Sequence, residues 1–392
     1  MKLKVAVVFG GRTCEHDVSV ISALQAAGAL DRESYDVVYV YIDRDGSWYT
    51  GDALKDIRFV KNFDPAKVDR VIPAGENGKL RLLSHDPKKK LFGTGLSVLA
   101  EADVVLPVMH GMNGEDGTLQ GMLEMFNVPY TSAGVMGSAV GMDKIAMKLL
   151  FMGCGFPVVN GVWFDRDRWA VDRESLCAMC EEKIGYPMFV KPASLGSSIG
   201  INRAVNRDGL EEAVDTACAY DRRILVEKGV ENLREVNCAV LGYADKVTAS
   251  VLEMPVSSSE FLNFADKYQR GEKGGKGMQS LTRRVPAPIG EELTKKVKQL
   301  AIDAFKAMDL KGVVRIDFIL DAQDNLFINE ANTIPGSLAF YLWEPEGIPF
   351  SKLLDRMIEH AFEAHADKNR SVFSYDSTIL SNLVNGSKGK LG

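Results

Sequence analysis

Hydrophobic positions in the first 130 residues fall into short runs separated by amphipathic stretches. Apolar runs of strand length occupy residues 3–10, 35–43 and 102–111, and helix-like segments occupy residues 18–30 and 117–126. Strand-like runs that alternate with helical segments are typical of parallel strands joined by crossover helices. The pattern therefore predicts a Rossmann-like α/β unit. Because the G-x-G-x-x-G fingerprint is missing, a dinucleotide-dependent dehydrogenase is disfavoured.

The rest of the chain divides into two further units and a tail. Short strands punctuated by glycine characterise the middle of the chain, and a helix-like segment at residues 290–308 belongs to the last third. The pattern assigns no role to a long basic loop at residues 271–284. The predicted domains are residues 1–130, 131–228 and 229–366, followed by a polar tail at residues 367–392.

A predicted hairpin, residues 315–320 and 326–332, carries polar side chains where buried strands should be apolar. These side chains are Arg315, Asp317, Glu330 and Asn332. Side chains alternate between the two faces of a strand, so the arginine and the aspartate share one face. If Asp321 pairs with Leu326, the two carboxylates lie opposite each other, and so do the arginine and the asparagine. The length of the loop decides whether this register is adopted.

Two carboxylates side by side on an apolar sheet repel each other, and each loses hydration on burial. A cation between them removes the conflict. Asp317, Glu330 and the amide oxygen of Asn332 form a set of hard oxygen ligands suited to Mg²⁺ that is shared with substrate phosphates. The alternative is a solvent-exposed hairpin whose acidic side chains are simply hydrated.

Nucleotide phosphates need cations and backbone N–H groups, and the segment KPASLGSSIG at residues 191–200 offers both. Lys191 ends an apolar strand, and Ser197 and Ser198 lie in the flexible loop that follows. Lys144 is a second candidate cation, with a surface helix lysine as the alternative. No G-x-x-x-x-G-K-[ST] motif occurs, which excludes a P-loop.

An adenine site is the second nucleotide-binding feature, in the segment LVEKGVENLREVN at residues 225–237. Glu227 can accept a hydrogen bond from the exocyclic amine of adenine, and the backbone of Lys228 and Val230 can contact the ring edge. Glu235 can bind the ribose hydroxyls. A solvated run of charges is the alternative.

Composition narrows the class of partner. The formal net charge of −6 argues against a general nucleic-acid surface, which needs an excess of Lys and Arg. No apolar run reaches the roughly 18 residues of a membrane span, and the opening apolar stretch is too short for a secretory signal. Six cysteines in such a chain indicate reduced thiols and a cytoplasmic location.

Taken together, these segments resemble the D-alanine–D-alanine ligase family of the ATP-grasp superfamily. The resemblance extends over almost the whole chain, and the order and spacing of its motifs match the family. The motifs are EHDVS (15–19), HGMNGEDGTLQGMLE (110–124), MDK (142–144), VKPASLGSSIG (190–200), DKY (266–268), RID (315–317) and NEANTIPG (329–336). The resemblance implies a Rossmann-like N-terminal domain followed by a two-part ATP-grasp fold, with ATP held between the second and third domains.

The resemblance also implies a reaction. ATP phosphorylates the carboxylate of one D-alanine, and the amine of a second attacks the acyl phosphate to form the dipeptide used in peptidoglycan precursors. Asp317, Glu330 and Asn332 correspond to the family's ligands for two Mg²⁺ ions, with Mn²⁺ as an alternative metal. The ATP-binding positions implied are Lys144, Lys191, Ser198, Glu227, Lys228, Val230, Glu235 and Lys267. A homodimer is implied as well.

The catalytic and substrate-binding positions follow from the same resemblance. Arg315 and the backbone N–H of Gly336 correspond to the donors that stabilise the tetrahedral intermediate. Glu15 corresponds to the residue that binds the ammonium group of the first D-alanine. Ser197 and Tyr268 complete a hydrogen-bonded set that closes a loop over the site and excludes water. His110 corresponds to a histidine beside the acceptor, with a locally satisfied strand-end histidine as the alternative.

Acceptor identity is the point at which the chain departs from the family. The family places a Ser before a Leu to bind the carboxylate of the second substrate, whereas this chain has Tyr341 before Leu342. Tyr268 favours an amine acceptor, because relatives that form an ester with D-lactate commonly have Phe there. D-serine and D-lactate remain alternative acceptors, and a non-catalytic nucleotide-binding regulator is the alternative from another class.

Overall fold

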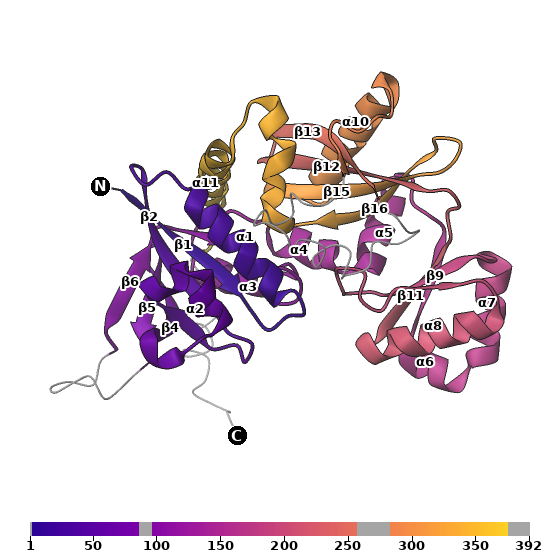
Figure 1. Ribbon diagram of the computed structural model, residues 1–392, viewed down its shortest axis with the longest axis horizontal. Helices are drawn as coiled ribbons and strands as arrows, with labels where there is room; N and C mark the ends of the chain where they lie inside the picture. The colour runs from indigo at the N-terminus through magenta and orange to yellow at the C-terminus, as the bar shows by residue number, and fades with distance from the viewer. Residues whose placement is uncertain (1, 86–95, 257–282, 375–392) are drawn as a thin grey trace, which may run out of the picture.

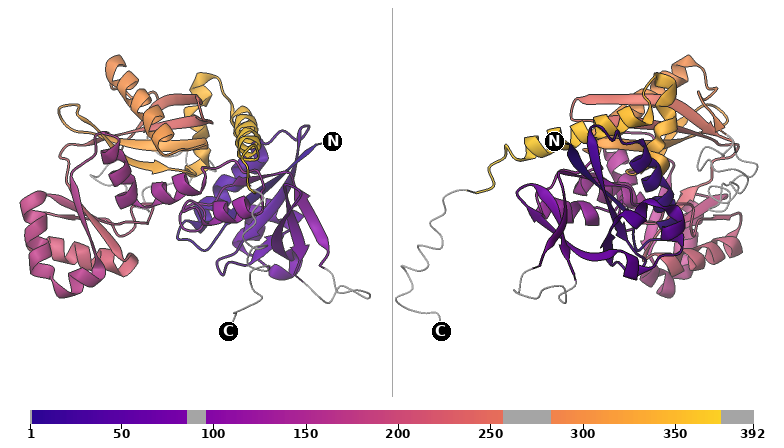
Figure 2. Two further views of the ribbon diagram at one scale, coloured as in Figure 1. Left: turned by 180° about the vertical axis from the view of Figure 1, so that it is seen from behind. Right: turned by 60° about the vertical axis from the view of Figure 1, so that its left-hand side comes forward.

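Three sheets follow one another along the chain in the computed structural model, which describes residues 2–85, 96–256 and 283–374 (Figure 1). Figures 1 and 2 show the seven-stranded and four-stranded sheets at opposite ends of the molecule, with the five-stranded sheet between them. Helices cover each sheet, so the predicted α/β class is confirmed. Among the described residues, no helix combines the length and apolar character that a membrane span requires.

The N-terminal sheet has the strand order β6-β5-β4-β3-β2-β1-β7. β1 pairs in parallel with β2 and β7, as the hydrophobic pattern predicts, but β3 to β6 extend the sheet in antiparallel fashion. The three predicted apolar runs thus contain the parallel strands of the sheet, and β3 to β6 were not predicted. Connections explain the difference: Asn77 and Gly78 alone join β4 to β5, and so short a turn links antiparallel strands. The elements are β1 (Leu3–Gly10), β2 (Tyr35–Ile42), β3 (Trp48–Thr50), β4 (Asp69–Glu76), β5 (Lys79–Ser84), β6 (Val98–Ala102), β7 (Val104–Pro107), α1 (His16–Ala29), α2 (Ile57–Lys61) and α3 (Thr118–Met125).

The middle sheet is antiparallel, with the order β10-β9-β11-β8. Its helices pack on one face, which leaves the other face turned toward the rest of the molecule (Figure 1). In the longest of these helices the buried residues recur at helical spacing, at Leu210, Ala213, Val214 and Ala217, which makes one apolar stripe. The elements are β8 (Gly161–Asp165), β9 (Met188–Pro192), β10 (Asn202–Ala204), β11 (Arg223–Lys228), α6 (Arg166–Val171), α7 (Arg173–Lys183) and α8 (Arg207–Tyr220); α4 (Val135–Met142) and α5 (Lys144–Gly153) precede them.

The third sheet has the order β14-β13-β12-β15-β16. α10 packs against β12 and β13, while α11 crosses back to the N-terminal unit and packs on α1 (Figure 2). A 3₁₀ segment, Gly336–Leu342, also packs on α1, so the loop after β16 joins the two ends of the chain. The elements are β12 (Arg234–Tyr243), β13 (Lys246–Pro255), β14 (Arg283–Arg284), β15 (Gly312–Leu320), β16 (Leu326–Asn332), α10 (Glu291–Ala307) and α11 (Phe350–Lys368).

The hairpin β15–β16 has the predicted pairing at its polar end. Asp317 pairs with Glu330, and Arg315 pairs with Asn332, which confirms this part of the register. The assumed pairing of Asp321 with Leu326 is wrong, because Leu326 pairs with Leu320. An irregularity between Asp317 and Phe318 leaves Asn329 as an extra residue on β16, and such a bulge shifts the register by one.

Candidate active site

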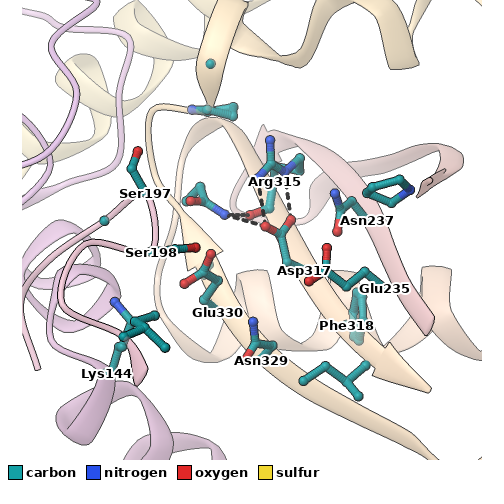
Figure 3. Close-up of a pocket in the computed structure, with 18 of the residues that line it drawn as sticks. Lys144, Ser197, Ser198, Glu235, Asn237, Arg315, Asp317, Phe318, Asn329 and Glu330 are labelled. Carbon is teal, nitrogen blue, oxygen red and sulfur yellow. Dashed lines mark hydrogen bonds and ion pairs between the residues drawn. The ribbon is translucent and has the colours of Figure 1, made fainter. Parts of the chain in front are cut away.

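One pocket opens between the middle and C-terminal sheets and reaches the loops of the N-terminal unit. Apart from Leu342, every predicted site residue that the structure describes lines it. The side chain of Leu342 lies in the apolar core, fully buried. Lys267 and Tyr268, and most of the basic loop 271–284, lie outside the described residues. Figure 3 shows side chains of the C-terminal sheet on one side of this pocket, with Lys144 of α5 and Ser197 and Ser198 of the loop after β9 on the other.

A row of polar side chains crosses the C-terminal sheet beneath the pocket. From β13 to β16 the paired residues are Glu253, Asn237, Asp317 and Glu330. All four border the pocket, and Figure 3 shows the last three side by side. Glu253 and Asn237 were not predicted from the sequence. Their signal is an acidic or amide residue among the buried apolar positions of β12 and β13.

Asp317 is 9 % exposed, so the alternative of a hydrated surface hairpin is excluded at this position. Arg315 donates to its two carboxylate oxygens from Nε and Nη2, each at 2.7 Å, and Asn332 Nδ2 donates to Oδ2 at 3.0 Å. Burial raises the pKa of Asp317, and repulsion from Glu330 adds to this, while Arg315 lowers it. The net shift is upward, because the arginine does not fully offset burial and the second carboxylate.

The oxygen atoms of Asp317, Glu330 and Asn332 are suitable ligands for a divalent cation. Asp317 and Glu330 carry carboxylate oxygens, and the amide oxygen of Asn332 is available because its nitrogen donates to Asp317. Hard oxygen ligands with neither Cys nor His suit Mg²⁺. No cluster of three or more His, Cys, Asp or Glu suited to a metal occurs in the described part of the chain, so the amide is needed to complete a three-ligand set.

Glu15 lies at the start of α1 and meets the Gly-Ser loop that follows β9. The Ser197 hydroxyl donates to Glu15 Oε1. A Cβ atom on Gly196 would lie 2.8 Å from Glu15 Oε2, so the loop can approach the carboxylate this closely because that position is glycine. The structure thus brings together two of the three residues predicted to form the closing hydrogen-bonded set.

His110 is buried, and both of its ring nitrogens have partners. Nδ1 lies 2.8 Å from the carbonyl of Ile334, and Nε2 lies 3.0 Å from Ser22 Oγ. Since a carbonyl accepts only, Nδ1 carries the proton and the serine hydroxyl donates to Nε2. Burial lowers the pKa of His110 to about 4, so the ring is neutral at pH 7. It borders the pocket, and it also anchors the loop after β16.

Glu115 is a second anchor of this loop and was not predicted. Its two carboxylate oxygens accept hydrogen bonds from the backbone N–H groups of Gly111 and Ile334, each at 2.8 Å. Burial, together with the charge of Glu15, raises the pKa of Glu115 to about 8. The N-terminal unit therefore holds the backbone of the segment that carries Asn332 and Gly336.

Glu227 has two lysine partners in the part of the pocket that lies beside α5 and the middle sheet. Lys148 Nζ lies 2.6 Å from Oε1, and Lys191 Nζ lies 2.5 Å from Oε2. Burial acts to raise the pKa of Glu227, but the two ammonium groups lower it to about 2. Lys148 was not predicted. It lies four residues after Lys144 and therefore on the same face of α5.

Lys144 begins α5, where Asp143 caps the helix by accepting from the backbone N–H groups of Ile145 and Ala146. Its ammonium group donates to the carbonyl of Leu195 at 2.5 Å, so it lies against the Gly-Ser loop. Burial lowers the pKa of Lys144. Two cations, a Gly-Ser loop and a pair of carboxylates in one pocket match the arrangement expected of an ATP-grasp enzyme.

Comparisons with known proteins agree with this class. A family model described as the D-ala D-ala ligase N-terminus matches residues 4–133, and one described as the D-ala D-ala ligase C-terminus matches residues 150–359. The chain therefore belongs to the D-alanine–D-alanine ligase family.

Similar proteins include two that are named D-alanine--D-alanine ligase. The one from Thermosipho melanesiensis is 39 % identical over 383 residues, which cover 96 % of this chain and 98 % of the relative. The one from Chloroherpeton thalassium is 40 % identical and covers 94 % of this chain and 98 % of the relative.

Two solved structures have a similar fold. The D-alanine-D-alanine ligase from Coxiella burnetii has a TM-score of 0.75 and 29 % identity, over 98 % of this chain and 99 % of that one. The VanG D-Ala:D-Ser ligase from Enterococcus faecalis has a TM-score of 0.75 and 28 % identity, over 92 % of this chain and 100 % of that one.

Replacing Glu227 by Gln is expected to lower the free energy of unfolding by about 3 kcal/mol, because two buried ammonium groups lose their counter-charge. Glu291→Gln is the matched control, since Glu291 forms an exposed ion pair with Lys295 on α10 and should change stability by less than about 0.5 kcal/mol. Urea unfolding of both variants measures the difference. Equal stabilities for the two variants would contradict the buried pairing.

His110 makes stability sensitive to acid. Its pKa of about 4 in the folded protein lies below the unfolded value of about 6.5, so unfolding is favoured by proton uptake as the pH falls from 6.5 toward 4. Between pH 6.5 and 4.5 the wild type should lose about 2 kcal/mol more than His110→Gln, as measured by urea unfolding at both pH values. The same acid loss in both proteins would rule out a buried neutral histidine.

Proposed function

We propose that this protein is an ATP-dependent, ADP-forming ligase that joins two D-alanine molecules into the dipeptide used in peptidoglycan precursor synthesis. The main observation behind the proposal is that two carboxylates and two lysines line the same pocket. These residues are Asp317, Glu330, Lys144 and Lys191. The names of its relatives support the choice of substrate.

The chemistry proposed is activation of a carboxylate followed by attack of an amine. A free carboxylate is a poor electrophile, whereas the phosphate of D-alanyl phosphate is a good leaving group. ATP transfers its γ-phosphate to the carboxylate of the first D-alanine and leaves as ADP. The neutral amine of the second D-alanine then forms the amide bond to the acyl carbon, the C–O bond to phosphate breaks, and the products are the dipeptide, phosphate and one proton. This route needs no nucleophile from the protein, and no cysteine is among the described residues that line the pocket.

Glu15 is proposed to bind the ammonium group of the first D-alanine. Ser197 holds the Glu15 carboxylate in place through its hydrogen bond. Arg315 and the N–H of Gly336 stabilise the oxyanion of the tetrahedral intermediate, an effect worth about 3 kcal/mol per donor. The double hydrogen bond to Asp317 supports this role for Arg315, because it orients the guanidinium before substrate arrives. Tyr268 completes the closing set in this proposal.

Asp317, Glu330 and Asn332 would hold two Mg²⁺ ions. Bound there, such ions neutralise the phosphates and the developing charge during transfer. Lys144, Lys191, Ser198 and Lys267 contact the phosphates, while Lys228, Val230 and Glu235 surround the adenosine.

The adenine contact of Glu227 would share its carboxylate with the two lysines that already bind it. Both oxygens of this carboxylate are bound by lysines. Each carboxylate oxygen has a second lone pair, so in this proposal Oε2 also accepts from the adenine amine.

The remaining parts of the proposal are a homodimer and a cytoplasmic location, where ATP is plentiful. Sedimentation of the purified protein measures the first. Mass spectrometry of the products formed from ATP, Mg²⁺, D-alanine and competing D-serine and D-lactate measures acceptor choice. The ligase should form mainly D-alanyl-D-alanine, and a preference for either competitor at neutral pH would reassign the acceptor.

Glu330→Gln tests the metal site. The change keeps the shape of the side chain but removes one charge, so turnover should fall at least about 100-fold while the fold is retained. Asp324→Asn is the matched control, because it removes a charge at the turn of the same hairpin, where Asp324 pairs with Arg234 outside the pocket. ADP release with D-alanine measures both, and near-normal turnover of Glu330→Gln would refute the ligand assignment.

A further inference from the structure

Two buried serines of α1 have no role in the mechanism above. Ser19 and Ser22 are 0 % and 1 % exposed, on a helix whose other buried residues are mainly apolar. A buried hydroxyl without hydrogen bonds is costly, so the partners of each serine show what it holds. The Ser19 hydroxyl accepts from the N–H of Gly10 at 2.8 Å and donates to the carbonyl of Val108 at 2.5 Å, which ties α1 to the N-terminal strands.

Ser22 instead holds the loop after β16, far away in sequence. Its Oγ accepts from the backbone N–H of Ser337 at 3.0 Å and donates to Nε2 of His110. His110 donates from Nδ1 to the carbonyl of Ile334. The hydrogen bonds thus run from one side of Gly336 to the other through a histidine and a serine of the N-terminal unit.

The backbone after Gly336 has an unfavourable conformation. Ser337 has φ 51° and ψ 25°, and Leu338 and Ala339 have nearly the same values. Three successive residues in the left-handed region are unfavourable without glycine, because each Cβ crowds the backbone. Such a conformation persists where its surroundings hold it.

Two of the contacts that hold this left-handed turn, residues 337–339, come from α1. Ser22 binds the N–H of Ser337, and Gln25 Oε1 accepts from the Ser337 hydroxyl at 2.7 Å. The side chains of Leu338 and Ala339 lie in the apolar core that α1 also lines, but apolar packing does not fix the direction of backbone groups. The two hydrogen bonds from α1 are directional and can do so.

The turn decides where the N–H of Gly336 points. Leu338 N–H donates to the carbonyl of Pro335 at 2.7 Å, so this carbonyl points into the turn. The same peptide unit carries the N–H of Gly336, which points in the opposite direction because the unit is planar and trans. Pro335 and Gly336 both line the pocket. Loss of the left-handed conformation at Ser337 would break the bond to Pro335 and let the peptide unit rotate.

We propose that Ser22 and Gln25 are positioning residues that hold the left-handed turn, so that the N–H of Gly336 stays directed at the tetrahedral intermediate. The inference rests on the proposed ligase function. Glu15, which is proposed to bind the first D-alanine, precedes the first residue of the same helix. One rigid helix therefore places a substrate-binding carboxylate and an oxyanion donor, and donors fixed in advance do not have to reorganise during the reaction.

The experiment separates the two chemical steps in a single turnover. Enzyme in excess over ATP is mixed with Mg²⁺ and saturating D-alanine, and ADP and dipeptide are measured in the same quenched samples. An oxyanion donor assists acyl transfer but not the phosphorylation that precedes it. In Ser22→Ala the rate constant of acyl transfer should fall about 10- to 100-fold, up to the effect of losing one donor, while that of ADP formation should not change.

Gln25 provides a second test that disturbs folding less, because its side chain is only partly buried. Gln25→Leu removes the acceptor of the Ser337 hydroxyl and should also delay the dipeptide relative to ADP. Gln25→Glu keeps an acceptor oxygen at this position and should restore the wild-type ratio of the two rate constants.

Ser19→Ala is the matched control for Ser22→Ala. It removes an equally buried hydroxyl from the same helix, and the hydrogen bonds of that hydroxyl stay within the N-terminal unit. This variant should lose stability in urea without any change in the ratio of the two rate constants.

The outcomes are distinguishable. A folded Ser22→Ala or Gln25→Leu variant in which both steps keep their rates, or slow by the same factor, overturns the positioning role. If Ser22→Ala does not fold, the two Gln25 variants decide by the same criterion, and failure of Gln25→Glu to restore the ratio also overturns the role. Absence of dipeptide formation by the wild type overturns the proposed function and this inference with it, whereas unchanged ratios beside an active wild type overturn the inference alone.

Discussion

The interaction on which the rest of the site depends is the burial of negative charge on an apolar sheet. Asp317 and Glu330 are paired neighbours, and Asp317 is almost inaccessible to water. Arg315 compensates one carboxylate, yet the pKa of Asp317 is still raised, since burial and the second carboxylate outweigh the arginine. Both carboxylates can remain ionised in this buried site only when further positive charge is bound beside them. Divalent cations that bind together with a nucleotide would supply that charge.

On the opposite side of the pocket the buried groups are mainly positive, and a carboxylate of the protein itself neutralises them. Lys148 and Lys191 would repel each other without Glu227 between them, and the carboxylate is held so strongly that its pKa falls to about 2. The N-terminal unit contributes neither charge set. It holds the loop after β16 through His110 and Glu115, which bind the carbonyl and the N–H of Ile334. Three structural units thus meet at one site, each with a different physical task.

Alternation of polar and apolar residues predicted the hairpin and which of its polar side chains share a face, because these depend on local geometry. The pairing of the two carboxylates was predicted only on the assumption that Asp321 pairs with Leu326, which is wrong, and the pair forms because β16 contains one extra residue. The same alternation could not reveal the extra residue Asn329, since a bulge is set by how the whole strand packs. Partners distant in sequence were missed for a similar reason. The link between Arg283 and Tyr341 joins residues from β14 and from the 3₁₀ segment after β16, and nothing local in either segment indicates the other. The family resemblance supplied roles for residues but not these contacts.

The most direct test of the account is the position of the divalent ions. Mn²⁺ can be located by its anomalous scattering in crystals grown with a non-hydrolysable ATP analogue. The account predicts anomalous peaks within about 2.5 Å of the oxygen atoms of Asp317, Glu330 and Asn332. Peaks at the nucleotide phosphates without any of these three side chains as ligands would contradict it.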